Sequence, residues 1–140
     1  MKQKASVVWQ GDFEDGRGSI TTESNALSEA HYFGTRFQKT RGTNAGELIA
    51  AAHAACFSMA LANHLRDVGF TANRISTTAI LTSEKLAAGW TVTSIELDVA
   101  AQVPHAKQGD FIEAALKAKI HCTVSRLLNA TISMNARLIP

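Results

Sequence analysis

Alternation of hydrophobic and polar residues predicts strands in the first part of the chain. Ala5, Val7 and Trp9 fall on one side of an extended segment, and a turn at 16–18 leads into a β-branched run at 19–22. Strands are enriched in β-branched residues, and glycines commonly provide the turns that join them. We therefore predict an N-terminal β-hairpin.

A long apolar segment from about Gly46 to Val68 has the composition of a helix. It is rich in Ala and Leu, and Gly69 is the residue expected just past a helix C-terminus. Between Leu48 and Ala62, apolar residues occur on nearly every side of such a helix. One sheet of a 140-residue monomer can cover only one side of it. We therefore expect a central buried helix and a partner subunit.

Two further strands are predicted after this helix. Residues 75–82 and 91–99 alternate between apolar and polar side chains, and residues 85–89 form the turn between them. Residues 132–138 alternate in the same way, which predicts a closing strand.

A second helix is predicted ahead of the closing strand. Asp110 followed by Glu113 resembles a capping box, and a short helical stretch lies over 124–128. The predicted buried stripe of the second helix consists of Ile112, Ala115, Leu116 and Ile120. The order strands, helix, strands, helix, strand predicts an α+β fold.

Length, composition and charge exclude several classes of protein. The chain has 140 residues, of which 46% are hydrophobic and 19% charged, so we predict a single domain over 1–140. The formal net charge is +2 and the basic residues are scattered, so the sequence shows no basic cluster of the kind that binds nucleic acid. The N-terminus lacks an apolar signal core, so we expect a cytoplasmic protein. The weakly polar stretch 48–62 is shorter than the roughly 20 residues needed to cross a bilayer.

The two cysteines, Cys56 and Cys122, are too few for a disulfide framework. In a reducing compartment, a pairing between them would be catalytic or redox-sensing. Each is otherwise a small buried hydrophobic residue, and apolar burial would raise its thiol pKa and make it inert. A functional Cys56 therefore needs a cation beside it to stabilise the thiolate.

His53 lies three residues before Cys56, on the same side of the predicted helix. It is either a core histidine with a satisfied hydrogen bond or a metal ligand. Together with Cys56, His121 and Cys122 it would supply the ligand types of a zinc site. Structural zinc ligands usually leave short loops, however, and not the interior of a long helix.

Several local strings closely resemble the osmotically inducible protein C branch of the OsmC/Ohr family. The similarity runs through nearly the whole chain and includes the separation of the two cysteines. The strings that carry it are Trp9-Gln10-Gly11-Asp12, Thr22-Glu23-Ser24, Thr35-Arg36-Phe37, Gly42-Thr43-Asn44, Glu47-Leu48-Ile49, Ala51-Ala52-His53-Ala54-Ala55-Cys56-Phe57-Ser58-Met59-Ala60-Leu61 and Cys122-Thr123-Val124-Ser125.

The resemblance implies an OsmC-like fold of antiparallel sheets around the central helix, in an intertwined homodimer with sites at its interface. It also implies a thiol-dependent peroxidase, without metal, haem or other cofactor, that reduces organic hydroperoxides and more weakly hydrogen peroxide. By the family motif Cys56 attacks the peroxide and becomes a sulfenic acid. Cys122 then forms a disulfide with it, which a small dithiol or a lipoylated protein reduces.

The family's arginine matches Arg36, which would stabilise both the thiolate and the departing alkoxide. The Ohr branch takes its arginine from an earlier turn, so Arg17 is a weaker candidate. The glutamate expected to hold the arginine is replaced by Gly46, and Glu47 aligns with a second family glutamate. A shift of one residue along a helix rotates the side chain by about 100°. Whether Glu47 holds the arginine in place of the missing glutamate is therefore open. Glu47 is otherwise a first-turn acid favoured by the helix dipole.

Two other functions remain open at this point. The first is a non-catalytic dimer that binds a small apolar ligand in an interface pocket, which the missing glutamate makes conceivable. The second is the zinc-stabilised domain. The peroxidase predicts a disulfide after peroxide treatment, whereas the ligand-binding protein keeps two free thiols.

Overall fold

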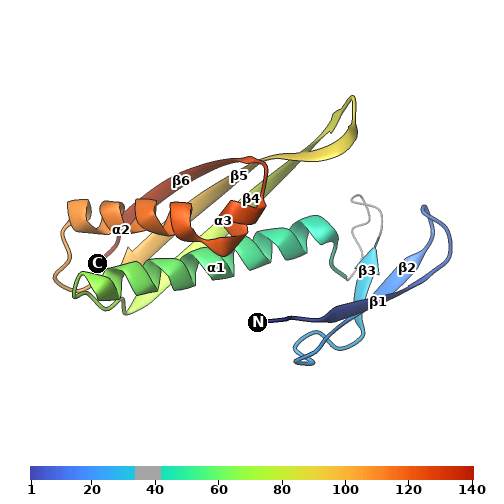
Figure 1. Cartoon of the computed structure of the whole chain (residues 1–140), viewed down its shortest axis with the longest axis horizontal. Coiled ribbons are helices and arrows are strands. Elements are labelled where there is room, and N and C mark those ends of the chain that lie inside the picture. Colours follow the sequence, from blue (N-terminus) through green and yellow to red (C-terminus); the bar gives the residue numbers. More distant parts are fainter. Residues whose placement is uncertain (34–41) are drawn as a thin grey trace. The chain divides into compact units, whose positions relative to one another are not determined.

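The computed structural model describes residues 1–33 and 42–140, and it divides the chain into two compact units, Met1–Leu48 and Ile49–Pro140 (Figure 1). Helix α1, Ala45–Asp67, begins in the first unit and runs on into the second. The mixture of helices and strands confirms the predicted α+β class. That residues 1–140 form one domain stays a prediction.

The first unit contains a small antiparallel sheet with the order β1-β2-β3. Strands β1 (Ala5–Gln10) and β2 (Arg17–Thr22) form the predicted hairpin, with Val7 opposite Ile20. Strand β3 (Ala30–Phe33) was not predicted, because four residues are too few for a clear alternation. The hairpin turn comes earlier than expected, since Arg17 and Gly18 already belong to β2.

Helix α1 begins and ends at recognisable capping residues. At its start, the backbone N–H of Glu47 donates to Asn44 Oδ1 at 2.9 Å, which is a typical N-cap. At its end, Gly69 has a φ of 86°, and its N–H donates to the carbonyl of Arg66. The N–H of Phe70 donates to the carbonyl of Leu65, which completes a Schellman motif. Gly69 thus ends the helix as the sequence predicts.

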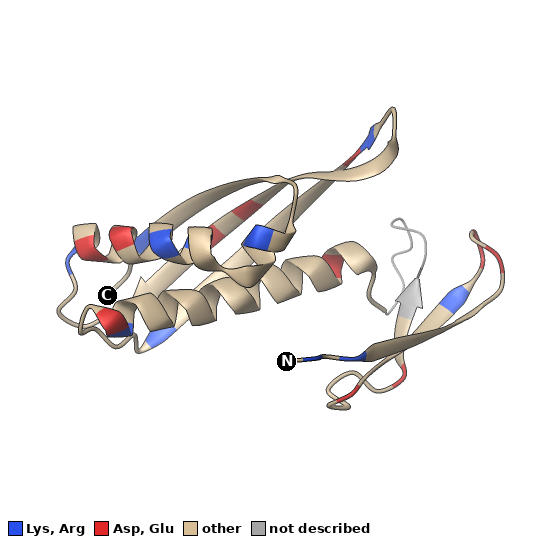
Figure 2. Ribbon diagram, viewed as in Figure 1, with Lys and Arg blue, Asp and Glu red and all other residues tan. Residues whose placement is uncertain are grey.

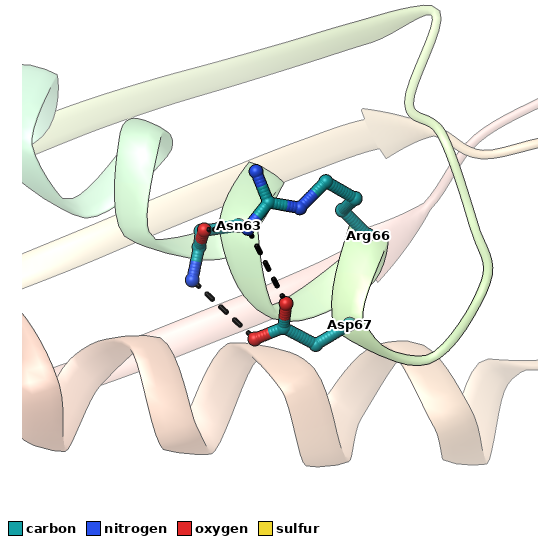
Figure 3. Close-up of polar contacts among 3 residues, drawn as sticks. All are labelled: Asn63, Arg66 and Asp67. Atoms are coloured by element: carbon teal, nitrogen blue, oxygen red, sulfur yellow. Dashed lines mark hydrogen bonds and ion pairs between the residues drawn. The ribbon is translucent and has the colours of Figure 1, made fainter.

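Three side chains form a polar cluster in the last turns of α1 (Figure 3). Arg66 donates to Asn63 Oδ1 at 2.6 Å and lies 3.4 Å from Asp67 Oδ1. Both charged side chains are mostly exposed, so the pair contributes little to stability. The cluster marks the point where the apolar part of α1 ends.

The second unit contains a sheet with the order β4-β5-β6. Strands β4 (Arg74–Leu86) and β5 (Gly89–Gln102) form a long antiparallel hairpin, whereas β6 (Thr131–Leu138) pairs with β5 in parallel. The prediction of purely antiparallel sheets is therefore wrong for this pair. The reason is the crossover through helices α2 (Gln108–His121) and α3 (Thr123–Leu127), which returns the chain to run alongside β5.

Helix α2 differs from its prediction at its start and on its buried face. It begins after Lys107, so Asp110 lies in the first turn and is not the cap. Leu116 and Ile120 are 48% and 65% exposed, which contradicts their place in the predicted stripe. Ala115 is buried as predicted, and Ile112 is partly buried against the core. The buried positions of α2 are Phe111, Ala114, Ala115 and Ala118. These follow helical spacing with one large and three small side chains.

The core of the second unit lies between its helices and one face of its sheet (Figure 1). Strand β5 supplies alternate residues, as expected for a strand with one buried face. Helix α1 supplies one side only. The buried members from β5 are Ile95, Leu97, Val99 and Ala101, and those from α1 are His53, Phe57, Leu61 and Leu65.

Within the single chain, helix α1 is covered on one side only, as expected from the sequence. Apolar side chains do surround α1, and charged residues occur only near its two ends (Figure 2). Its other side is nevertheless open, with Met59 70% exposed and Ala51 and Ala52 also exposed. This exposed apolar side agrees with the expected partner subunit, which stays a prediction.

The expectation that the apolar stretch is too short for a membrane is not confirmed. Helix α1 has 23 residues and, by length and composition alone, is apolar enough to cross a bilayer. This is weak support for a membrane span, because an apolar helix that packs in a soluble protein can pass the same test. The absence of a membrane partner therefore stays a prediction.

Candidate functional site

Cys56 lies in the middle of α1, at the border between the covered and the open side of the helix. Its side chain is half-buried and packs against the core of the second unit. The preceding residue, Ala55, is exposed, and the following residue, Phe57, is completely buried. This position leaves the thiol next to the core and within reach of solvent.

Cys122 lies at the junction between α2 and α3. It is both the C-cap of α2 and the N-cap of α3, and its backbone N–H donates to the carbonyl of Ala118 at 2.8 Å. Its side chain is only 1% exposed. At this junction between two helices, the thiol of Cys122 is therefore buried in the core.

The fold brings the two thiols together, although 66 positions separate them in the sequence. Cys56 and Cys122 are both free, and their side chains are hydrogen-bonded to each other. Contact between the two sulfur-bearing side chains is the first requirement for a disulfide. The prediction that these side chains meet is therefore supported, and the disulfide between them stays a prediction.

The pKa of the Cys56 thiol is lowered. Burial alone would raise it, but hydrogen bonds from the Cys122 side chain, the backbone of Val124 and the backbone and side chain of Thr123 outweigh that effect. Hydrogen bonds to the charged form favour the thiolate. The first turn of α3 and the second cysteine thus do part of what a neighbouring cation was expected to do.

The pKa of the Cys122 thiol is raised. Burial is the largest cause, and the hydrogen bond to Cys56 adds to it, while hydrogen bonds from Ser125 and Val124 offset part of the shift. Since the two thiols share a hydrogen bond, these shifts belong to the pair. In the arrangement that results, Cys56 is the better thiolate and Cys122 keeps its proton.

His53 is completely buried, and its Nε2 lies 2.8 Å from Ser125 Oγ. Burial lowers its pKa, so the imidazole is neutral. Among the described residues, no partner reaches its Nδ1. The prediction of a core histidine with a hydrogen bond is confirmed for one of its two ring nitrogens.

The zinc alternative is wrong. His53 contacts Ser125, and His121 instead has its Nδ1 3.2 Å from Nε2 of His64. Within residues 1–33 and 42–140, no three His, Cys, Asp or Glu side chains gather as a metal site would require. The four proposed ligands therefore do not form one site.

The remaining predicted site residues belong to the first part of the chain. Arg36 lies outside the described residues. Glu47 is exposed in the first turn of α1, at the third helical position after the Asn44 cap. Arg17 is exposed at the start of β2. Asn44 caps the helix directly, so α1 has a defined start although Gly46 lies in its first turn.

Two residues that sequence reasoning did not single out make hydrogen bonds to the thiols. Thr123 and Ser125 both lie in α3 and hydrogen-bond to Cys56 and Cys122, respectively. The only signal was their place in the string Cys122-Thr123-Val124-Ser125, which helped to carry the family resemblance. Spacing alone gives no reason to assign either hydroxyl a role.

The arrangement suits nucleophilic redox chemistry. A stabilised thiolate is the attacking species in thiol chemistry, and a second thiol in contact can convert its oxidised form to a disulfide. A hollow of about 370 Å³ elsewhere on the second unit is lined by His64, Val68, Phe70 and others, and its lining includes neither cysteine. The two thiols therefore lie outside this hollow, where α1 meets α3.

Comparisons with known proteins agree with this arrangement. A family model described as OsmC-like protein matches residues 37–137. Proteins named peroxiredoxin OsmC from Escherichia coli (strain K12) and from Shigella flexneri are each 43% identical over 137 residues, covering 97% of this chain and 96% of theirs.

Solved structures share the fold at lower identity. The organic hydroperoxide resistance protein OhrB of Bacillus subtilis matches with a TM-score of 0.76 and 20% identity, covering 96% of this chain and 98% of its own. An OsmC-like protein from Mycoplasma pneumoniae matches with a TM-score of 0.82 and 14% identity, covering 100% and 99%. At such identities the likeness shows the fold alone. Taken with the family model and the 43% identical relatives, it places the chain in the OsmC-like protein family.

Proposed function

We infer that this protein is a cysteine-based peroxidase that reduces organic hydroperoxides, and more weakly hydrogen peroxide. The observation that carries the proposal is the contact between two free thiols whose pKa values are shifted in opposite directions. The relatives named peroxiredoxin OsmC, and the fold shared with an organic hydroperoxide resistance protein, support this choice of substrate.

In the first step the Cys56 thiolate attacks one oxygen of the hydroperoxide. The O–O bond breaks, the sulfur becomes a sulfenic acid, and the alkoxide leaves and takes up a proton to form an alcohol. The sulfur loses two electrons and the peroxide gains them. Hydrogen bonds from Thr123, Val124 and Cys122 favour the thiolate that begins this step.

In the second step the sulfur of Cys122 attacks the sulfenic sulfur of Cys56. The Cys56 S–O bond breaks, a disulfide forms, and the hydroxide leaves as water with the proton from Cys122. A dithiol, either a small molecule or a lipoylated protein, then reduces the disulfide by exchange. All the electrons come from thiols, so the proposed cycle needs no metal or cofactor bound to this protein.

Arg36 is the cation that we expect beside Cys56, on the strength of its match to the family's arginine. Its guanidinium would stabilise both the thiolate and the alkoxide that leaves. Glu47 would orient it in place of the family glutamate missing at Gly46. Arg36→Ala should slow the first step about a hundredfold, whereas Arg17→Ala should leave it unchanged. The reverse result would assign the role to Arg17.

A homodimer is the assembly that best fits the open side of α1. Met59 is exposed on a helix with charges only near its ends, and water is a poor solvent for such a surface. We expect the protein to sediment in the cytoplasmic fraction and, when purified, at twice its 15.0 kDa chain mass. Sedimentation at the single-chain mass would contradict the dimer.

The proposal is tested by consumption of cumene hydroperoxide in the presence of a dithiol. The Cys56→Ser variant should lose activity by at least about a thousandfold, because it lacks the nucleophile. Cys122→Ser is the matched control, since it removes a thiol from the same contact and should still reduce about one equivalent of peroxide. Equal turnover by Cys56→Ser would reject the peroxidase. Two thiols that stay free after hydroperoxide would favour the ligand-binding alternative.

A further inference from the structure

The proposed reaction does not use His53, although it is the buried polar residue of the described core. Full burial of an imidazole is costly unless its polar atoms have partners. Its contact with Ser125 crosses from α1 to α3, the helix that begins beside Cys122. This contact therefore lies next to the two thiols.

The hydrogen-bond pattern around His53 favours one direction of donation. If Nδ1 carried the proton, an N–H would be buried without a described partner. If Nε2 carries it, the imidazole donates to Ser125 Oγ, and only an acceptor lone pair stays unpaired. An unpaired buried N–H is the rarer case in proteins. His53 is therefore best described as the donor and Ser125 as the acceptor in the 2.8 Å contact.

The same argument orients the hydroxyl of Ser125. With its oxygen accepting from His53, its own proton is available for another acceptor. Ser125 is also hydrogen-bonded to the Cys122 side chain, where it favours the thiolate. A continuous chain of donors thus runs from His53 through Ser125 and Cys122 to Cys56.

We propose that Ser125, oriented by His53, holds the sulfur of Cys122 for its attack on oxidised Cys56. Ser125 contacts the reacting sulfur, and His53 is a positioning residue that acts through Ser125. This inference rests on the proposed peroxidase and concerns its second step, in which the Cys122 proton leaves with the sulfenic oxygen as water and a disulfide forms. The hydroxyl of Ser125 stabilises the negative charge that develops on the Cys122 sulfur.

The second step needs such help more than the first. Burial and the hydrogen bond to Cys56 both raise the pKa of Cys122, so its sulfur is a weak nucleophile before oxidation. Oxidation removes the Cys56 thiolate with which Cys122 shares its proton. The hydrogen bond from Ser125 does not depend on the state of Cys56 and can therefore persist into the attack.

The test is a single turnover with one equivalent of cumene hydroperoxide, quenched at intervals into dimedone, which traps sulfenic acid. Intact-mass analysis then gives separate rates for oxidation of Cys56 and for closure of the disulfide. Ser125→Ala should oxidise at nearly the rate of the unsubstituted protein and close about tenfold more slowly. Ser125→Thr keeps the hydroxyl and should close at nearly the original rate.

Variants of His53 repeat the test without touching Ser125. His53→Gln keeps an N–H near the position of Nε2 and should close faster than His53→Leu, which has no donor. Ser58→Ala is the matched control, because Ser58 lies on α1 and its hydroxyl hydrogen-bonds to the carbonyl of Ala54 and, at 2.7 Å, to Thr77. Thermal unfolding of every variant measures the purely structural loss.

Equal closure rates in Ser125→Ala and the unsubstituted protein would overturn the inference while leaving the peroxidase intact. Disulfide closure that is slowed as much in Ser58→Ala as in Ser125→Ala would also overturn it, because a general loss of stability would then explain both results. Slow closure in both His53→Gln and Ser125→Thr would also overturn it, because the donors are retained there. A protein in which Cys56 never forms a sulfenic acid would instead reject the proposed function, and this inference with it.

Discussion

Cys56 and Cys122 are in contact, yet their surroundings shift their pKa values in opposite directions. Cys56 stands on the border of a long helix and receives hydrogen bonds from the start of α3. Cys122 is buried between two helices, where desolvation dominates. The difference shows that burial and hydrogen bonding set the pKa of each thiol, although both residues are cysteines. In the proposed cycle, the thiol with the lowered pKa attacks the peroxide and the other holds its proton until the first is oxidised.

Among the tests of this difference between the two cysteines, removal of the Cys122 thiol should have the largest effect on turnover. In Cys122→Ser the first step survives but the disulfide cannot form, so Cys56 should accumulate as sulfenic acid or oxidise further. Steady-state turnover should fall at least about a hundredfold, because an external thiol cannot match the effective concentration of one in contact. Steady-state consumption of cumene hydroperoxide, with dimedone trapping, measures both effects. Undiminished turnover would mean that an external thiol resolves Cys56.

The reactivity of the two thiols toward an alkylating agent should differ next most strongly. With its pKa lowered, Cys56 keeps its thiolate to lower pH, whereas Cys122, with its pKa raised, ionises only at higher pH. At pH 7 iodoacetamide should therefore label Cys56 several-fold faster. Peptide mapping of partly labelled protein from pH 6 to pH 10 gives both profiles. Coincident profiles would remove the basis for the two roles.

A smaller effect is expected from Thr123, whose side chain hydrogen-bonds to Cys56. Thr123→Ala removes one of several donors, so the pKa of Cys56 should rise and the rate of the first step should fall about threefold. Thr123→Ser keeps the hydroxyl and is the control. Stopped-flow oxidation of both variants by cumene hydroperoxide measures the difference. A larger loss in Thr123→Ser than in Thr123→Ala would contradict this source of stabilisation.

Much of the fold follows from the sequence because its elements carry strong local signals. Helix α1 was predicted to within about a residue at each end, since its Ala- and Leu-rich composition and Gly69 agree. The parallel pairing of β5 and β6 was missed because strand direction depends on the crossover and not on alternation. The buried face of α2 was missed because Ala114 and Ala118 carry weaker apolar signals than Leu116 and Ile120.

The candidate site was predictable only in part. Family resemblance identified Cys56 and Cys122, and the structure brings them into contact. Burial of His53 with a hydrogen bond was predicted, but its partner Ser125 was not. The contacts of Thr123 and Ser125 with the thiols were also missed, because they arise where α1 meets α3 and have no spacing signature. The sequence correctly indicated that a single chain cannot cover the whole of α1, but hydrophobicity alone does not show what covers the other side.

The central claim is that Cys56 and Cys122 form a disulfide when the protein reduces a hydroperoxide. Intact-mass spectrometry before and after one equivalent of cumene hydroperoxide tests this most directly, with peptide mapping to locate the bond. We predict a loss of the mass of two hydrogen atoms, with both cysteines joined in one cross-linked peptide and restored by a dithiol. An unchanged mass with two free thiols, after the hydroperoxide has been offered to fully reduced protein, would contradict the account.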